Sequence, residues 1–346
     1  MGPSEKERSS ALGPMNTTGR PVFPLLRRTV LKRCSLCATR CAIVFLCVLL
    51  ILPFLSCCTS LSRGALPSLI SHKERMFWEI RGPQGSVYIL GTISVGSEKL
   101  LHFQDKILDV FDSASRLYAE LGSEDIKNFA SVLQRRMLHG MLEQENAAPT
   151  LSSLSREELE MLRSTLGDDM HTLSRFEPWV MRVALYQALI AHTKLDSGKN
   201  IEAFLYQRAG NRKILGLDSI QKHLNMLSFG NREEQITLLR ALIALGKSPA
   251  DFKGRLGALV RSYLSNDKTA LGRVSTELDA LVTKDAAGGL HRRYVAEIAA
   301  SRRAAWAEEF YRLSLQHGIT FVFASAGHFC GPESVFDIMR KRRLLQ

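Results

Sequence analysis

The sequence predicts an α/β fold in which a small mixed β-sheet is covered by many helices, with large helical insertions between its strands. Short apolar runs bounded by turn residues indicate strands, whereas residues 126–207 and about 231–315 show helical periodicity. The strands lie far apart in the chain, so long helical segments must connect them. With 45% hydrophobic residues among 346, the chain can bury a substantial core.

Two short strands open the predicted fold. The runs 77–80 and 86–90 are separated by the Gly- and Pro-containing segment 81–85, which predicts a β-hairpin. A helix is expected at 103–111, and it leads into a strand at 116–120. Glu120 is the last residue of that strand.

Capping signals mark helices in the first insertion, which separates the strand at 116–120 from the next one. Ser155 and Glu158 have the spacing of a capping box, and Pro178 suits the first turn of a helix at 179–191. The short apolar run 213–217 then predicts a fourth strand.

A second helical insertion precedes the last strand. Asp218 is expected to be the N-cap of its first helix, because a carboxylate accepts hydrogen bonds from the first-turn amides. The run 320–324 predicts the fifth strand, residues 325–328 its exit loop, and residues 332–341 the final helix.

The amino-terminal 58 residues have the layout of an export segment. Five basic residues precede an uncharged apolar run at 41–56, as in a secretory signal. The run ends beside Cys57 and Cys58, which resembles a relaxed bacterial lipobox and makes either cysteine a candidate for lipid attachment. An uncleaved anchoring helix and a cleaved soluble form are the alternatives. We therefore expect residues 1–58 to direct export, residues 59–72 to be a linker, and residues 73–346 to form the functional domain.

The charge and cysteine content argue against two functions. The formal net charge is +12, but residues 1–58 hold eight Lys/Arg against two Glu, which leaves 38 Lys/Arg against 32 Asp/Glu in the remainder. No interleaved run of Arg and aromatic residues follows, so we expect no nucleic-acid binding. Cys34 and Cys37 have a C-x-x-C spacing, but they border the apolar run and lack a second ligand pair. Cys330, outside this segment, is expected to be a small buried residue.

Polar side chains follow three of the predicted strands. Thr92 and Ser94 follow the second strand, Glu120 ends the third, and His328 lies in the exit loop of the last. Ligands of open α/β sheets bind at the carboxyl ends of strands. These residues therefore predict a shared site.

At these residues the chain resembles the TraB/GumN family, which is related to the Tiki proteases and more distantly to the erythromycin-esterase and ChaN groups. The resemblance rests on several blocks that occur in family order: 77–80, 87–96, 116–120, 177–179, 215–218, Arg302 with Trp306, and 323–331. The first G-x-x-H motif of the family is degenerate here, because Ser94 occupies its histidine position.

The resemblance implies a divalent metal ion bound by Glu120 and His328, with a metal-bound water as the nucleophile. It also leads us to expect Thr92, Asp218, Arg302 and Arg303 to bind substrate around that centre. Besides Ser94, this sequence departs from the family pattern at Ser325 for Gly, Arg303 for Asn and Asp218 for Glu. An inward guanidinium of Arg303 would oppose metal binding.

Three functions remain open from the sequence. The first is an exported protein that has a weakened or lost metallohydrolase activity and binds a peptide or protein partner at the membrane surface. The second is an active metallopeptidase that uses Glu120, His328 and an atypical third ligand such as His102. The third is a serine-type hydrolase in which His328 activates Ser94, although the flanks of Ser94 lack the G-x-S-x-G pattern. Alternatively, Glu120 has a purely structural role and forms an ion pair with Arg302 or Arg303.

Overall fold

A computed structural model describes residues 65–346, apart from residues 144–149, 194, 196–199 and 284–288. The predicted export segment at 1–58, with Cys57 and Cys58, lies outside the described residues. Among those that are described, no helix is both long and apolar enough to cross a membrane.

Six strands form one mixed sheet in the order β1-β2-β3-β6-β4-β5. β1, β2 and β3 pair antiparallel, whereas β3, β6, β4 and β5 run parallel to their neighbours. The strands are β1 (Ser68–Ser71), β2 (Phe77–Arg81), β3 (Gly85–Thr92), β4 (Arg116–Ala119), β5 (Ile214–Gly216) and β6 (Gly318–Ser325). The α/β prediction is confirmed. Residues 68–71, which we expected to belong to a linker at 59–72, instead form β1 and pair with β2.

Helices connect these strands as the sequence predicts. Between β3 and β4 lies α2 (Asp105–Ser113), and between β4 and β5 lie α3 (Ser123–Glu143), α4 (Arg156–Leu166), α5 (Asp169–Leu173), α6 (Pro178–His192) and α7 (Ile201–Ala209). Between β5 and β6 lie α8 (Ile220–Leu227), α9 (Arg232–Gly246), α10 (Pro249–Leu264), α11 (Lys268–Val282), α12 (Gly289–Tyr294), the π-helical segment η4 (Val295–Ala300) and α13 (Ser301–Ser314). The chain ends with α14 (Val335–Lys341).

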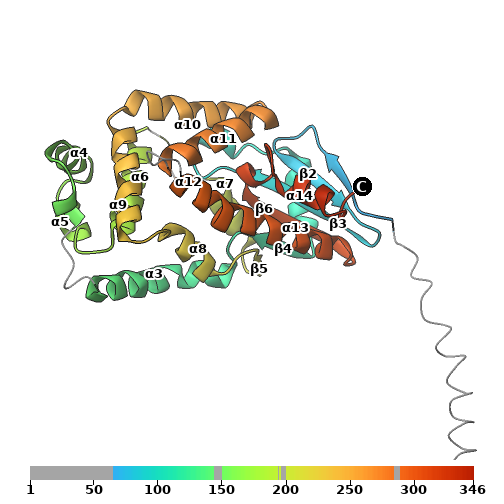
Figure 1. Cartoon of the computed structure of the whole chain (residues 1–346). Helices are drawn as coiled ribbons and strands as arrows, with labels where there is room; N and C mark the ends of the chain where they lie inside the picture. The colour runs from blue at the N-terminus through green and yellow to red at the C-terminus, as the bar shows by residue number, and fades with distance from the viewer. Residues whose placement is uncertain (1–64, 144–149, 194, 196–199, 284–288) are drawn as a thin grey trace, which may run out of the picture. The chain divides into compact units, whose positions relative to one another are not determined.

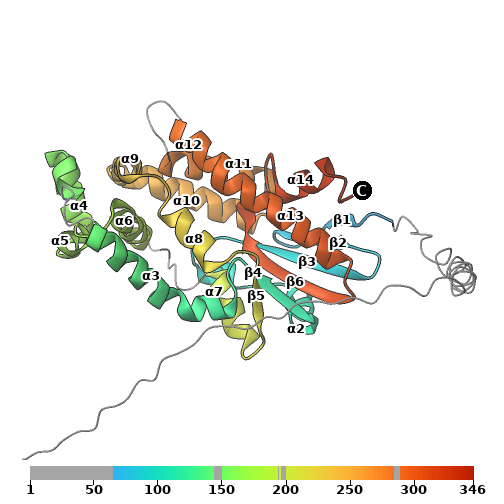
Figure 2. The same ribbon diagram turned by 60° about the horizontal axis from the view of Figure 1, so that its bottom comes forward.

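Both faces of the sheet carry helices. Phe321 and Phe323, two residues apart on β6, point to the same face, where they contact Phe111 of α2 and Tyr206 of α7. α13 packs on the opposite face, and α14 is joined to β2 by a Trp78–Phe336 contact. Figures 1 and 2 show α13 running across the sheet, while α4, α5, α6 and α9 pack on one another away from it.

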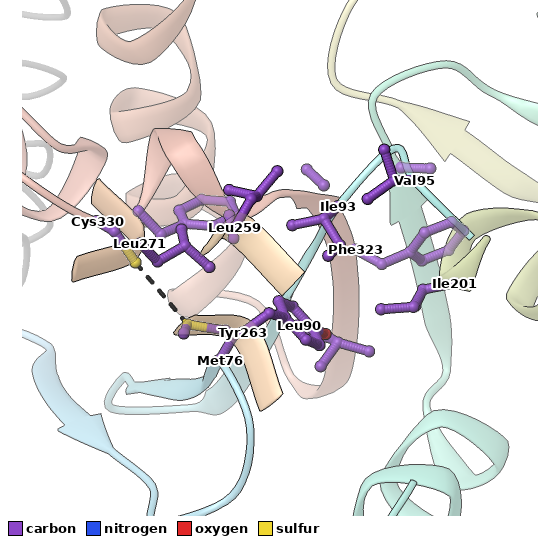
Figure 3. Packing of buried hydrophobic residues seen from close by; sticks show 14 of the residues in the cluster. Met76, Leu90, Ile93, Val95, Ile201, Leu259, Tyr263, Leu271, Phe323 and Cys330 are labelled. Atoms are coloured by element: carbon purple, nitrogen blue, oxygen red, sulfur yellow. Dashed lines mark hydrogen bonds between the residues drawn. The ribbon is translucent and has the colours of Figure 1, made fainter. Parts of the chain in front are cut away.

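A buried cluster ties the end of β3 to α10 and α11. Tyr263 of α10 is fully buried, and its hydroxyl donates to the carbonyl oxygen of Gly91 at 2.7 Å. The Cys330 thiol lies 4.0 Å from the sulfur of Met76, and both belong to this cluster (Figure 3). Cys330 is 7% exposed, as predicted, and burial raises the pKa of its thiol to about 12. It is therefore protonated and inert at neutral pH.

Gly272 of α11 packs directly on the backbone of the loop after β6. A Cβ atom at this position would lie 2.6 Å from the Gly331 nitrogen, so Gly272→Ala must displace backbone. We expect this substitution to lower the free energy of unfolding by about 1–3 kcal/mol, as other overpacking substitutions do. Gly254→Ala is the matched control: it lies inside α10 with no atom within 4 Å. It should be stabilising by about 0.5–1 kcal/mol. Equal effects of the two substitutions in urea denaturation would contradict the close contact.

Candidate functional site

The parallel strands end together and bring several predicted residues to one edge of the sheet. Thr92, the last residue of β3, pairs with Ser325 of β6, and Ala119 of β4 pairs with Phe323 of β6. Glu120 therefore emerges beside the end of β6. The backbone amide of Asp218 donates to the carbonyl oxygen of Glu120 at 2.9 Å, which places Asp218 next to it.

Arg302 of α13 lies at the centre of this edge. Its Nη2 donates to Glu120 Oε2 at 2.7 Å, and its Nε donates to Asp218 Oδ2 at 2.8 Å. The three side chains are only 10%, 17% and 1% exposed for Arg302, Glu120 and Asp218. The guanidinium also lies 4.9 Å from the ring centroid of Trp306. Arg302 is thus held by two carboxylates and an aromatic face.

His328 completes the cluster from the loop after β6. Its Nε2 lies 3.4 Å from Arg302 Nη1, and its ring meets the Trp306 ring edge-on at 4.7 Å. Burial lowers the pKa of His328 to about 4; the charge of Glu120 opposes this shift, and the guanidinium groups of Arg302 and Arg303 add to it. The imidazole is therefore neutral at pH 7, and Nε2 can accept a hydrogen bond from Arg302.

Glu120 stays ionised although it is buried. Burial raises its pKa, but Arg302, His328 and the backbone amide of Ser325, which donates to Oε1 at 2.9 Å, together outweigh this and lower the pKa to about 2. Both carboxylate oxygens of Glu120 therefore already accept hydrogen bonds. Arg302 opposes binding of a cation here because its guanidinium cannot lose its charge.

These residues do not fit the metal centre that the resemblance implies. The described residues contain no group of three or more His, Cys, Asp or Glu side chains arranged to hold a metal ion. Asp218 Oδ1 is buried without a hydrogen-bond partner among the described residues, so it is the carboxylate oxygen left for a ligand. One such oxygen beside a fixed guanidinium is a poor site for a divalent cation.

Three other predicted residues, Arg303, Ser94 and His102, do not join this cluster. Arg303 is at the rim, where its Nε and Nη1 donate to the carbonyl oxygens of Ala299 and Glu333 at 3.2 and 3.0 Å. It is Arg302, not Arg303, that faces Glu120. Ser94 and His102 are exposed, and the structure gives Ser94 no hydrogen bond with His328. The predicted N-cap at Asp218 is wrong, because Ser219 caps α8 and leaves Asp218 to Arg302.

A cavity of about 660 Å³ opens beside the cluster. Arg302, Arg303 and His328 line it together with residues of α11, α12 and η4. η4 ends two residues before Arg302, and such π-helical turns occur frequently at functional sites. This volume is typical of a ligand site.

Sequence reasoning missed a second group of polar residues behind Glu120. A cavity of about 250 Å³ is lined by Glu120, Glu202 of α7, Tyr206 and His223 of α8. The Thr92 hydroxyl donates to Glu202 Oε1 at 2.6 Å, so Thr92 interacts with Glu202 and not with Arg302. A sequence signal exists for Glu202, since it is the only charged residue in the apolar run 201–206. His223 has no such signal.

The pKa of Glu202 predicts an unusual pH dependence. Burial and the charge of Glu120 raise it to about 7, so between about pH 4.5 and 7 the folded state binds more protons than the unfolded state. Stability should therefore fall as pH rises through that range, by up to roughly 1.4 kcal/mol per pKa unit. Glu202→Gln should remove this loss in urea denaturations across that range. The exposed Glu98→Gln controls for the change in charge. If the difference between wild type and Glu202→Gln does not vary with pH, the raised pKa is wrong.

The fold and site define an α/β protein with an arginine-centred polar cavity at the carboxyl ends of parallel strands. The sequence profile of the TraB/PrgY/gumN family matches residues 76–344, and the chain belongs to that family. The resemblance inferred from the sequence is thus confirmed. No solved structure matches the chain.

Proposed function

We propose that this TraB/PrgY/gumN-family chain is exported and tethered to a membrane, where it binds a peptide or protein partner and has weakened or lost metallohydrolase activity. The observation that carries the proposal is the position of Arg302. Its guanidinium lies 2.7 Å from Glu120 and 3.4 Å from His328, the two residues the resemblance assigns to a metal ion. A fixed cation between these groups supports binding of a ligand over metal-assisted hydrolysis.

The cavity beside Arg302 supports recognition of a polar ligand. Nε and Nη1 of Arg303 donate hydrogen bonds to backbone carbonyl oxygens, and no carboxylate forms an ion pair with Arg303 among the described residues. A guanidinium is suited to a carboxylate because its N–H groups match the spacing of the two oxygens. A carboxyl group of a peptide is the ligand that this arrangement fits.

The metallopeptidase is a second candidate for a state in which Arg302 has moved, because Asp218 Oδ1 is buried with no hydrogen-bond partner among the described residues and lies next to Glu120. In that case Asp218 would replace the missing histidine once Arg302 moved away. The serine alternative has less support, since Ser94 is exposed and the Nε2 of His328 faces Arg302.

One experiment separates the three functions. The full chain, purified in detergent, is mixed with fluorescein-labelled peptides, and binding and cleavage are measured for wild type, His328→Ala and Ser94→Ala. We expect binding without cleavage in all three. Cleavage that requires His328 and is abolished by a chelator would establish the metallopeptidase. Cleavage that resists a chelator and is lost in Ser94→Ala would establish the serine hydrolase.

The tether is tested separately. If Cys57 or Cys58 carries a lipid, mass spectrometry of the chain isolated from membranes should find the lipid mass on the first residue of a shortened chain. Replacement of both cysteines by Ser should then release the chain from the membrane. An unshortened chain would instead support an amino-terminal anchoring helix.

A further inference from the structure

A second cavity adjoins the one beside Arg302. It has a volume of about 630 Å³ and lies among β1, β2, α11 and α14. Its apolar wall consists of Trp78, Phe329 and Phe336, whose rings contact one another with centroids 5.5 to 5.7 Å apart. We call it the aromatic cavity, and the one beside Arg302 the polar cavity. An apolar side chain is the group that the aromatic cavity suits.

The two cavities meet at shared residues. Thr276 of α11, with Cys330 and Pro332 of the loop after β6, lines both. Here α11 approaches the loop at Gly272 and Gly331, where no side chain fits between the backbones. Gly331 has a φ of 83°, which a glycine adopts without strain. The two cavities are therefore adjacent, and a ligand that occupies both must pass Thr276 and Pro332.

Each cavity contains a cation that forms no direct ion pair among the described residues, although the charges of Asp279 and Glu74 act on Arg303 and Lys268, respectively. In the polar cavity it is Arg303, whose Nη2 has no hydrogen-bond partner in that part of the chain. In the aromatic cavity it is Lys268, which donates to Ser71 Oγ and the His72 carbonyl oxygen and lies 4.9 Å from the Trp78 ring centroid. Arg302, by contrast, is already neutralised by Glu120 and Asp218. The unpaired cations favour an acidic ligand.

We propose that one extended peptide occupies both cavities, with an acidic group beside Arg303 and an apolar side chain in the aromatic cavity. This rests on the proposed function and adds the ligand's chemistry and its path across Thr276 and Pro332. Asp279 and Glu333 also line the polar cavity, but neither forms an ion pair with Arg303. An incoming carboxylate therefore displaces no ion pair of Arg303.

The test uses the full chain in detergent and labelled hexapeptides that carry one Asp and one Leu at varied spacings. Thr269→Trp fills the rim of the aromatic cavity from an exposed position, and Asn128→Trp, on the exposed side of α3, is its control. Arg303→Gln removes the cation of the polar cavity. Affinity is measured by fluorescence anisotropy. A second peptide set replaces Leu by Ala, and a third replaces Asp by Asn.

We expect Thr269→Trp to weaken binding of the best Asp–Leu peptide about tenfold and Asn128→Trp to leave it unchanged. The Ala peptide should bind wild type about tenfold more weakly and be insensitive to Thr269→Trp. Arg303→Gln should weaken the Asp peptide about tenfold but not the Asn peptide. If Arg303→Gln weakens binding and Thr269→Trp does not, the two-cavity inference fails while the proposed function stands. If no peptide binds wild type, both fail.

Discussion

Replacing Arg302 by Met should lower the free energy of unfolding by about 3–5 kcal/mol, because it leaves Glu120 and Asp218 charged and unpaired in a buried site. Asp218 is 1% exposed and Glu120 17%, so water cannot fully replace the guanidinium. The Ser325 amide remains as a partner of Glu120, but no hydrogen bond of the described residues remains for the Asp218 carboxylate. Urea denaturation at neutral pH measures the loss.

Arg303→Met is the matched control for this substitution. The two arginines are adjacent on α13, but Arg303 donates only to carbonyl oxygens and forms no ion pair among the described residues. Its replacement should cost less than about 1.5 kcal/mol, the upper range for ordinary hydrogen bonds. Similar losses for both variants would mean that Arg302 does not hold buried carboxylates together.

The pH dependence of Arg302→Met provides a second check. In wild type the pKa of Glu120 is lowered to about 2, so its contribution to stability is present above its ordinary pKa of 4.5 and is lost as pH falls toward 2. Replacing Arg302 removes the largest of the groups that lower the pKa of Glu120, so this pKa should rise. The variant should therefore be less destabilised, relative to wild type, at acidic pH. A gap that widens on acidification would contradict this.

Trp306→Ala should lower the free energy of unfolding by about 3–5 kcal/mol, the range observed for removal of a buried aromatic side chain. Trp306 is fully buried, and its ring contacts both Arg302 and His328. The substitution leaves a cavity on the face of the sheet that α13 covers and removes the surface that orients Arg302. Thermal denaturation and urea denaturation both report the loss.

Trp306→Phe separates the packing of this ring from its other properties. The indole Nε1 is buried without a hydrogen-bond partner among the described residues, so removing it breaks no hydrogen bond there. Phe keeps an aromatic face beneath Arg302 and should recover more than half of the stability lost in the Ala variant. If Phe and Ala are equally destabilising, the ring does not act through packing and stacking.

The sheet could be predicted because its strands are short apolar runs between turn residues. The run 320–324 lies in β6, where all five side chains are buried, and the run 213–217 contains β5, an edge strand in which Ile214 is buried and which α3 contacts. β1 could not be predicted, since four residues after Pro67 carry little periodicity. Its pairing with β2, a contact between strands, makes it a strand.

The candidate site was only partly visible in the sequence. The strand-end rule predicts that Glu120 and His328 converge, and the structure brings them to Arg302. Which of Arg302 and Arg303 faces inward depends on the rotation of α13. Trp306 and Phe310 follow Arg302 at intervals of four residues and are buried, so this face of the helix includes Arg302. That spacing is a sequence signal for the inward arginine.

Long-range contacts account for what the sequence could not reveal. Asp218 and Ser219 are both good N-cap residues, and the choice between them follows from Arg302, which lies 84 residues away in sequence. Glu202 meets Thr92 across 110 residues. Such pairings depend on the packing of α7, α8 and α13 against the strand ends. Local sequence patterns indicate which face of a helix is buried, but not which distant residues it meets.

If Arg302 takes the place of a metal ion between Glu120 and His328, as proposed, the chain should not bind metal stoichiometrically. The most direct test is the metal content of the full chain, which is purified in detergent, equilibrated with zinc or manganese, passed through a desalting column and measured by mass spectrometry. We predict substoichiometric metal, unchanged by His328→Ala or Glu120→Gln. About one metal ion per chain, lost in both variants, would contradict the account, because specific metal sites bind stoichiometrically.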